Sequence, residues 1–104
     1  ISIAGTYYYD ASKVSDYIRT GDELICTPEP DNKHDNNALA LYWKDETRES
    51  KLGYIPRNLN KKVKILIDEH KEIKFIVSEI SDYYDDINIL FDVITYINNK
   101  DNSY

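Results

Sequence analysis

The sequence has few of the residues that build disulfide-linked or membrane-spanning structures, and each shortage excludes a class of protein. A single cysteine, Cys26, excludes an internal disulfide framework. Because Cys26 follows Leu24 and Ile25, we expect an inert buried thiol rather than a nucleophile. No apolar run approaches the roughly 20 residues that a membrane helix needs, and no secretory signal is evident. We therefore expect no membrane contact and a cytoplasmic location.

The sequence is also short of the groups that hold metals and cofactors. Its two histidines, His34 and His70, are far apart, whereas zinc needs about four Cys, His or carboxylate ligands at suitable spacing. No EF-hand, P-loop or dinucleotide-binding motif is present, and nothing frames a nucleophile. The sequence therefore predicts no metal, no cofactor and no enzyme activity. Methionine is absent and the chain begins at Ile1, so either the start residue has been removed or the chain is a piece of a longer protein.

Basic residues are outnumbered by acidic ones, 13 to 19, which gives a net charge of −6. This total argues against strong non-specific binding to nucleic acid, which depends on neutralising phosphates. The charges are unevenly distributed, however, because residues 50–67 contain no acid and residues 81–92 contain no base. A local field can therefore differ in sign from the total. The basic segment holds Lys51, Arg57, Lys61, Lys62 and Lys64.

The alternation of apolar and β-forming residues predicts a small, mostly β domain. Six strands are expected, at residues 1–9, 23–27, 38–43, 51–55, 72–80 and 87–93, with a turn at residues 83–86. A short helix is predicted within residues 10–20, capped by Ser12, and a second begins at Pro56. In the second, Leu59, Val63, Leu66 and Ile67 recur at helical spacing and are expected to face the core. The predicted fold is a small β-barrel of about six strands with one or two short helices. It spans residues 1–97 and is followed by a frayed polar tail at residues 98–104.

A polar loop at residues 28–37, directly before the strand at 38–43, is the feature around which we expect function to be organised. Pro28 and Pro30 stiffen its start, and its Asp and Asn side chains can hydrogen-bond to nearby backbone. Such a loop can hold donors and acceptors rigidly at one edge of a sheet.

Aromatic and basic residues near this loop favour binding of a nucleic-acid strand. Tyr8, or a neighbour in the run of three tyrosines, and His34 offer rings on which bases can stack. Arg57, Lys61 and Lys33 can contact phosphates, although Arg57, Lys61 and Lys64 can equally be a solvated helix face. Asp35 would repel phosphate. It therefore either accepts a hydrogen bond from a sugar hydroxyl or base amine, or closes an Asx turn.

Four blocks of the sequence, at residues 3–9, 21–24, 29–41 and 52–57, resemble the HIRAN domain in order and spacing over roughly residues 1–95. Its specific parts are the Pro-x-Asn-x-x-Asp-x-Asn-Ala core at residues 30–38 and the Gly-Tyr-Ile-Pro-Arg block at residues 53–57. HIRAN domains occur at the N-terminus of certain SWI/SNF-type DNA helicases and as stand-alone bacterial proteins. The resemblance implies an OB-like barrel that binds single-stranded DNA at a free 3′ end.

The resemblance also implies roles for individual residues. Tyr8 and Tyr9 match a tyrosine pair that stacks on the terminal base, and Asp35 matches an aspartate that reads the 3′-hydroxyl. An aromatic position before that aspartate maps to His34, and phosphate-contacting positions at the start of the following helix map to Tyr54 and Arg57. Tyr7 stands where a basic residue often precedes the tyrosine pair. The predicted binding residues are thus Tyr8, Tyr9, His34, Asp35, Tyr54, Arg57 and Lys61.

The acidic total and the acidic hairpin at residues 82–92 favour an alternative, a protein-interaction or regulatory module on the same barrel without DNA binding. This alternative predicts a basic protein partner, whose binding would weaken as salt is raised. The expected partners are therefore single-stranded DNA or DNA ends, or else a protein.

Overall fold

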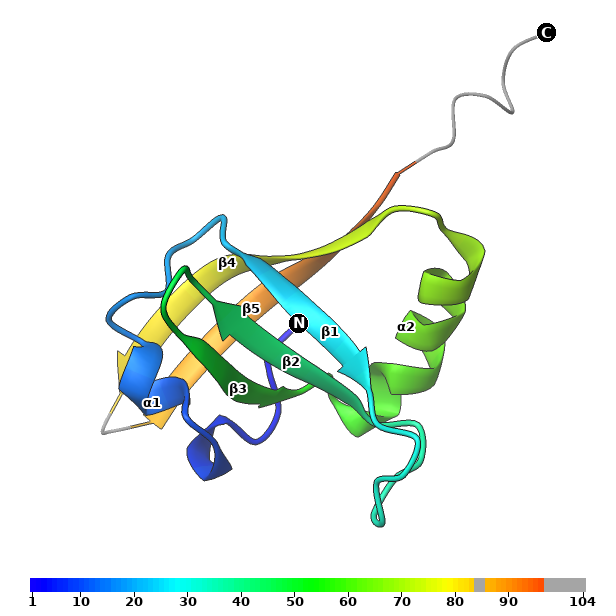
Figure 1. Ribbon diagram of the computed structural model, residues 1–104, viewed down its shortest axis with the longest axis horizontal. Helices are drawn as coiled ribbons and strands as arrows, with labels where there is room; N and C mark the ends of the chain where they lie inside the picture. The colour runs from blue at the N-terminus through cyan, green and yellow to red at the C-terminus, as the bar shows by residue number, and fades with distance from the viewer. Residues whose placement is uncertain (84–85, 97–104) are drawn as a thin grey trace, which may run out of the picture.

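A computed structural model describes residues 1–83 and 86–96 of the chain. Two short helical turns come first, followed by three strands, one longer helix and a final pair of strands (Figure 1). In chain order the elements are η1 (Thr6–Tyr8), α1 (Ala11–Val14), β1 (Glu23–Pro28), β2 (Leu39–Lys44), β3 (Glu49–Tyr54), α2 (Arg57–Glu69), β4 (Ile73–Tyr83) and β5 (Asp86–Thr95). None of the helices in this described part of the chain is long and apolar enough to cross a membrane.

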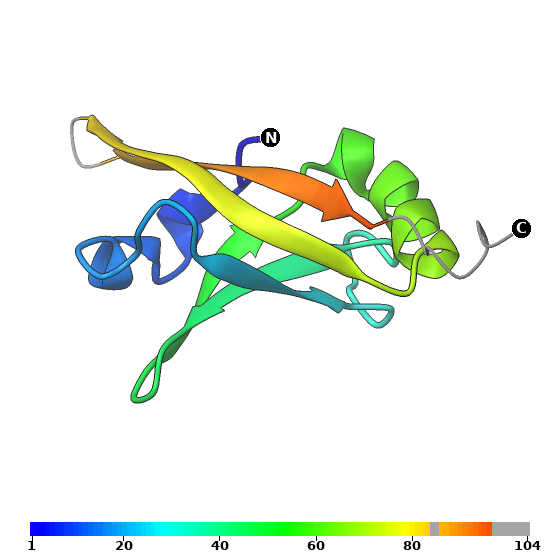
Figure 2. The same ribbon diagram turned by 90° about the horizontal axis from the view of Figure 1, so that it is seen from above.

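The five strands form one antiparallel sheet in the order β3-β2-β1-β4-β5, curled into a half-barrel. The bend lies at β1, because its start pairs with β4 through Glu23 and Leu24, while the rest of it pairs with β2. Figure 2 shows β4 and β5 as one limb, β2 and β3 as the other, and α2 at one end between them. The short turns η1 and α1 lie toward the opposite end (Figure 1).

The predicted first strand is not a regular strand. In residues 1–9 only two isolated bridges form, Ser2 with Leu90 of β5 and Ala4 with Tyr54 of β3, and a 3-10 turn follows. The turn begins at Gly5, whose left-handed φ of 79° takes the chain out of extended geometry. The expected mostly β fold is confirmed. A closed barrel of six strands is not formed by the described residues, because the N-terminal segment touches each edge strand of the half-barrel at a single bridge.

Close approach of the N-terminal segment to β3 depends on Gly53. A Cβ atom at this position would collide with the backbone carbonyl of Ala4. Two hydrogen bonds, from Ala4 N to Tyr54 O (2.8 Å) and from Tyr54 N to Ala4 O (2.9 Å), hold the segment there. This contact brings Ala4 and the residues that follow it close to the end of β3.

The core is filled by alternating residues of the strands. Leu39, Leu41 and Trp43 of β2 are all buried, as their shared face predicts, and they pack with Phe75 and Phe91 of the other limb. The hairpin predicted from residues 38–43 and 51–55 is confirmed as β2 and β3, although β3 begins two residues earlier than expected.

The helix predicted from Pro56 is also confirmed. Pro56 is its N-cap, Val63 is buried, and Leu66 and Ile67 are half-buried rather than central to the core. The helix predicted within residues 10–20 is one turn, Ala11–Val14, and Ser12 lies inside it rather than at its cap. The predicted turn at 83–86 includes residues 84–85, and the predicted tail covers 98–104; both segments lie outside the described residues.

Candidate nucleic-acid interface

The loop between β1 and β2 is held by hydrogen bonds rather than by a strand ladder. At its ends, Glu29 N donates to Ala38 O (2.9 Å) and Ala38 N donates to Asp35 O (3.1 Å). Inside it, the side-chain oxygen of Asn32 accepts from the backbone N–H groups of His34 (2.9 Å) and Asp35 (3.1 Å). The loop therefore has one defined shape, which fixes the direction of the Asp35 side chain.

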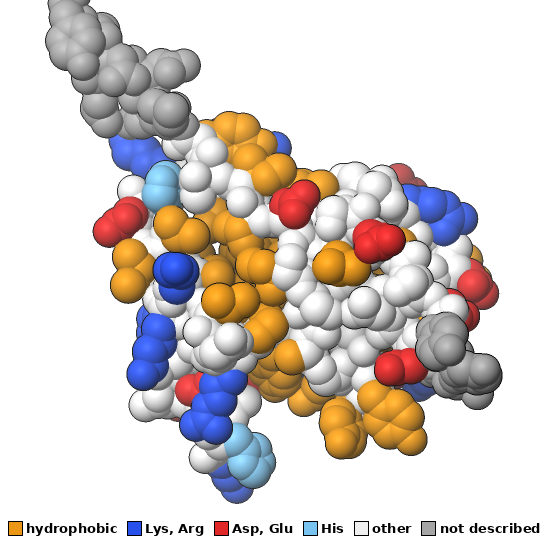
Figure 3. Space-filling view, turned by 180° about the vertical axis from the view of Figure 1, so that it is seen from behind, with side chains coloured by type: hydrophobic (Ala, Val, Ile, Leu, Met, Phe, Trp, Pro, Cys, Tyr) orange, Lys and Arg blue, Asp and Glu red, His pale blue; other side chains and the backbone are white. Residues whose placement is uncertain are grey.

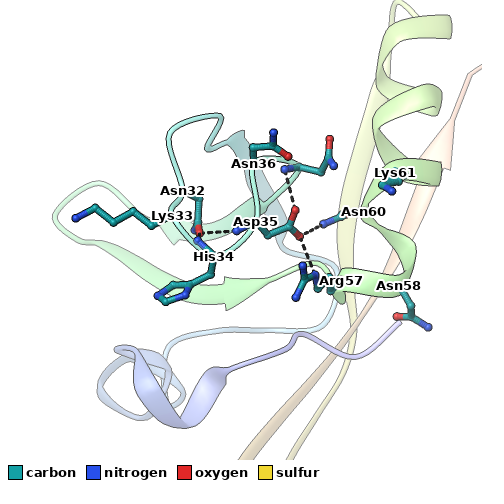
Figure 4. Close-up of a pocket in the computed structure, with 10 residues that line it drawn as sticks. Asn32, Lys33, His34, Asp35, Asn36, Arg57, Asn58, Asn60 and Lys61 are labelled. Atoms are coloured by element: carbon teal, nitrogen blue, oxygen red, sulfur yellow. Dashed lines mark hydrogen bonds and ion pairs between the residues drawn. The ribbon is translucent and has the colours of Figure 1, made fainter.

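Asp35 connects this loop to the start of α2. One carboxylate oxygen accepts from the backbone N–H of Asn37 at 2.9 Å, so the Asx turn considered for this residue is present. The other oxygen accepts from the side-chain amide of Asn60 at 2.7 Å and lies 3.6 Å from Nε of Arg57 (Figure 4). The Asn37 N–H, followed by the Asn60 amide and the charges of Arg57 and Lys61, holds the pKa of the Asp35 carboxyl below its ordinary value against the opposing effect of desolvation. The carboxylate is thus kept ionised.

Two depressions meet at Asp35. We call the first the apolar pocket; it has a volume of about 320 Å³ and includes Ala4, Tyr9, Tyr54 and Ile55 in its lining. We call the second the polar cleft; it has a volume of about 660 Å³ and is lined by amides and cations, among them Asn36, Asn58, Arg57 and Lys61. Five residues line both depressions: Asn32, His34, Asp35, Arg57 and Asn60. A carboxylate therefore stands between an aromatic wall and a basic, amide-rich surface.

The three consecutive tyrosines point in different directions. Tyr9 lines the apolar pocket, and its ring meets that of Tyr54 edge-on at a centroid distance of 5.6 Å. Tyr7 and Tyr8, with exposed fractions of 80% and 81%, contact each other on η1 and line neither depression. A 3-10 turn has about three residues per turn, so neighbouring side chains in it diverge. The structure thus brings together Tyr9, Tyr54, His34, Asp35, Arg57 and Lys61, and leaves Tyr8 outside.

Comparison with known proteins places the chain in a family. The model of the HIRAN domain matches residues 1–98. The chain belongs to the HIRAN domain family. This family is one of nucleic-acid-binding modules. The resemblance noted from the sequence is thereby confirmed.

A solved structure supports the fold of this HIRAN domain. It is the crystal structure of a protein from Lactobacillus plantarum, similar with a TM-score of 0.68 and 24% sequence identity. The similarity covers 88% of this chain and 86% of that chain. At this identity the likeness concerns the fold alone. A comparison with curated proteins found no match.

A charged cluster contacts the two rings, Tyr9 and Tyr54, that form the aromatic wall of the apolar pocket. The Lys51 ammonium donates to Glu29 (2.9 Å) and to the Tyr54 hydroxyl (2.7 Å), and the Tyr54 hydroxyl donates to Glu29 (2.7 Å). The same ammonium lies 4.8 Å from the Tyr9 ring centroid and 4.5 Å from that of Tyr54. Because its hydroxyl is engaged in this cluster, Tyr54 presents its ring to the pocket.

Ionisation within the cluster follows from these contacts. Burial alone would raise the pKa of Glu29, but hydrogen bonds from Lys51, Tyr54 and Asn32 outweigh it and hold that pKa below its ordinary value. Burial would lower the pKa of Lys51, but its bonds to Tyr54 and Glu29 raise it. Burial, assisted by Glu29, raises the pKa of Tyr54 to about 12. The cluster is therefore a stable ion pair at neutral pH.

Sequence reasoning missed three residues that shape the site: Asn60, Glu29 and Lys51. Asn60 has an exposed fraction of 2%, although it is polar. The signal for it was present, since Asn60 precedes Val63 by three residues and so falls on the buried side of the helix. For Glu29 and Lys51 the sequence carries no comparable signal, because their pairing joins residues far apart in the chain. Cys26 is half-buried, and burial raises its pKa to about 12, which favours the unreactive thiol that we expected.

Positive side chains gather along one side of the HIRAN domain (Figure 3). They extend over α2 toward the β1–β2 loop, where His34 and Lys33 are exposed and point away from Asp35 (Figures 3 and 4). Within residues 1–83 and 86–96, no three His, Cys, Asp or Glu side chains are grouped so that they could hold a metal ion.

Proposed function

We propose that this HIRAN domain binds single-stranded DNA by its free 3′ end. In this arrangement the terminal base enters the apolar pocket, the 3′-hydroxyl donates to Asp35, and phosphates lie against Arg57 and Lys61. The observation that carries the proposal is the position of Asp35, with a fixed, ionised carboxylate on the border between the apolar pocket and the basic polar cleft.

The carboxylate supplies the selectivity for an end. An ionised carboxylate is only an acceptor and has about four lone-pair directions. Asn37 and Asn60 occupy two of them, and Arg57 lies near a third at 3.6 Å, so capacity remains for one hydroxyl donor. A phosphate at the same place would be repelled. A nucleotide inside a strand carries a 3′-phosphodiester there, whereas a terminal nucleotide carries a hydroxyl.

The aromatic wall supplies affinity for the base. Stacking of a base on an aromatic side chain contributes about 1–3 kcal/mol and tolerates any sequence. Tyr9 and Tyr54 offer their rings in the pocket, and His34 lies on its rim. Tyr8 is exposed on η1 and is available only to a base outside the pocket.

The basic residues supply attraction to the backbone in spite of the net charge of −6. Arg57 and Lys61 line the polar cleft, Lys64 lies further along the same side of the helix, and no acid precedes Asp68 on it. For single strands, each phosphate that a cation neutralises adds about 0.7 to the steepness with which log affinity falls against log salt. We expect a shallow slope, in keeping with the small number of cations in the cleft.

Titration of short single strands tests the proposal. One strand ends in a normal 3′-hydroxyl, and its matched partner ends in a 3′-deoxy nucleotide, which removes the hydroxyl without adding charge. The normal strand should bind more tightly, Asp35→Ala should abolish the preference, and Arg57→Ala should weaken both strands alike. Asp35→Asn keeps the shape and removes the charge, so it reports whether the ionised form is needed. Equal and negligible binding of both strands at low salt would refute the proposal.

A second candidate function, binding of a basic protein, is favoured by the surface near η1. The exposed rings of Tyr7 and Tyr8 adjoin the start of β5, because the Thr6 hydroxyl donates to Ile87 O at 2.7 Å. Asp82 and Asp86 are exposed at this end of the β4–β5 hairpin. Capture experiments that recover nucleic acid and no protein would count against this candidate.

A further inference from the structure

The basic lining of the polar cleft continues along α2, away from Asp35. Arg57 and Lys61 line the cleft, and Lys64 follows at a spacing of three residues. Residues at i, i+4 and i+7 lie on one side of a helix, and all three of these side chains are exposed. Among the described residues, no salt bridge involves Lys61 or Lys64. We call these three residues the basic stripe.

The basic stripe has a defined length. The next residue on the same side of α2 is Asp68, an exposed carboxylate that would repel a phosphate. With a rise of about 1.5 Å per residue, Lys64 lies about 10 Å along the helix from Arg57. Nucleotides in a duplex strand rise by about 3.4 Å each, and an extended single strand rises by more, so the stripe spans at most about three nucleotides.

The opposite way out of the site is unfavourable for a phosphate backbone. Beyond Tyr9 the chain continues into Asp10, whose N–H bonds to Lys51 O at 3.2 Å beside β3. The cations on this side are already paired with carboxylates, Lys13 with Asp10 at 3.3 Å and Lys51 with Glu29 at 2.9 Å. Within the part of the chain that the structure describes, the side of the site toward α2 therefore offers cations without a salt-bridge partner, whereas the cations beyond Tyr9 are paired.

We propose that a DNA strand held at its 3′ end leaves the site through the polar cleft and runs in the 5′ direction along the basic stripe, Arg57–Lys61–Lys64. This inference rests on the function proposed above. It implies a polarity for the bound strand and a footprint that ends near Lys64. Affinity should therefore rise with strand length until the stripe is covered and then level off.

A length series with matched lysine variants tests this path. Lys64→Glu removes the far end of the stripe. Lys62→Glu makes the same charge change at an exposed position of the same helix, turned about 160° away from Lys64. Thymidine oligonucleotides from the dinucleotide to the decanucleotide compete with a labelled reference strand, at two salt concentrations. Thermal unfolding of each variant checks that the fold is kept.

The dinucleotide should bind both variants equally. The hexanucleotide should bind Lys64→Glu about five- to tenfold more weakly than Lys62→Glu, with a salt slope lower by about 0.7. If the unmodified domain keeps its preference for a 3′-hydroxyl but the two variants weaken every length alike, the strand path is overturned and the proposed function survives. A length-dependent weakening with Tyr8→Ala and none with Lys64→Glu would also overturn the path, because the strand would then cross η1. A domain without any 3′-hydroxyl preference would overturn both proposals.

Discussion

The β1–β2 loop and the 3-10 turn η1 both border the site, but they are built in opposite ways. In the loop, Glu29, Asn32 and Asp35 each hold several partners through hydrogen bonds of 2.7–3.1 Å. On η1, Tyr7 and Tyr8 contact each other and are otherwise about 80% exposed. The boundary between the two regions falls between Tyr8 and Tyr9, since Tyr9 packs against Tyr54 and Lys51.

This contrast indicates which groups can discriminate between ligands. A carboxylate fixed by its neighbours loses no freedom when a hydroxyl binds, whereas an exposed ring must be ordered by whatever it contacts. Selectivity for an end is therefore expected from the loop and the polar cleft, and η1 is expected to add adaptable contact area.

The largest effect on stability should come from a substitution that removes hydrogen bonds of the β1–β2 loop. Glu29→Ala leaves the side chains of Lys51, Tyr54 and Asn32 without their shared acceptor. We expect the free energy of unfolding to fall by about 2–3 kcal/mol, measured by urea denaturation. Tyr7→Ala, on η1, should change it by less than about 0.5 kcal/mol. Equal decreases in the two variants would show that the loop is not the more tightly constrained region.

Substitutions of the neighbouring tyrosines test whether the boundary of the binding site lies between Tyr8 and Tyr9. Tyr9→Leu should weaken binding of a short 3′-ended strand by about 1–3 kcal/mol, because the substitution removes the stacking surface from the apolar pocket. Tyr9→Phe keeps the ring and should bind nearly normally, and Tyr8→Leu should change the affinity less than Tyr9→Leu does. Fluorescence anisotropy with a dinucleotide measures all three. A larger effect of Tyr8→Leu would move the stacking site to η1.

Most of the fold could be predicted from local pattern, and the parts that could not depend on tertiary contact. Alternation indicated the strands around Leu41 and Ile89, and helical spacing indicated the helix around Val63, because those patterns record burial directly. The extended reading of residues 1–9 was wrong. Their β-forming side chains gave no sign that the left-handed φ of Gly5 would start a 3-10 turn.

The residues of the site likewise divide into those that the sequence pattern predicts and those that only tertiary contacts bring together. The grouping of Asp35 with His34 and Arg57 was anticipated from the loop and from the resemblance, and Asn60 could have been inferred from its place on the buried side of α2. The partnership of Glu29 with Lys51 joins the β1–β2 loop to β3, so no spacing in the sequence encodes it. Likewise, the divergence of Tyr8 from Tyr9 follows from turn geometry rather than from residue type.

The smallest expected effect is a change in how the stability of the domain responds to acid. It tests the hydrogen bonds that Glu29 accepts in the β1–β2 loop. The pKa of Glu29 is lowered in the folded state, so its contribution to stability is present above its unfolded pKa of about 4.3 and is lost as the pH falls through the folded value. Between about pH 5 and pH 3 the free energy of unfolding should therefore fall less steeply in Glu29→Gln than in the unmodified domain. Asp35 and Asp45 also have lowered pKa values, but they titrate in both proteins, so the difference in slope reports Glu29. Tyr7→Ser, which alters only η1, should keep the original slope. Urea denaturation at several pH values measures these slopes, and identical slopes for Glu29→Gln and the unmodified domain would mean that the carboxylate of Glu29 gains nothing from its partners in the fold.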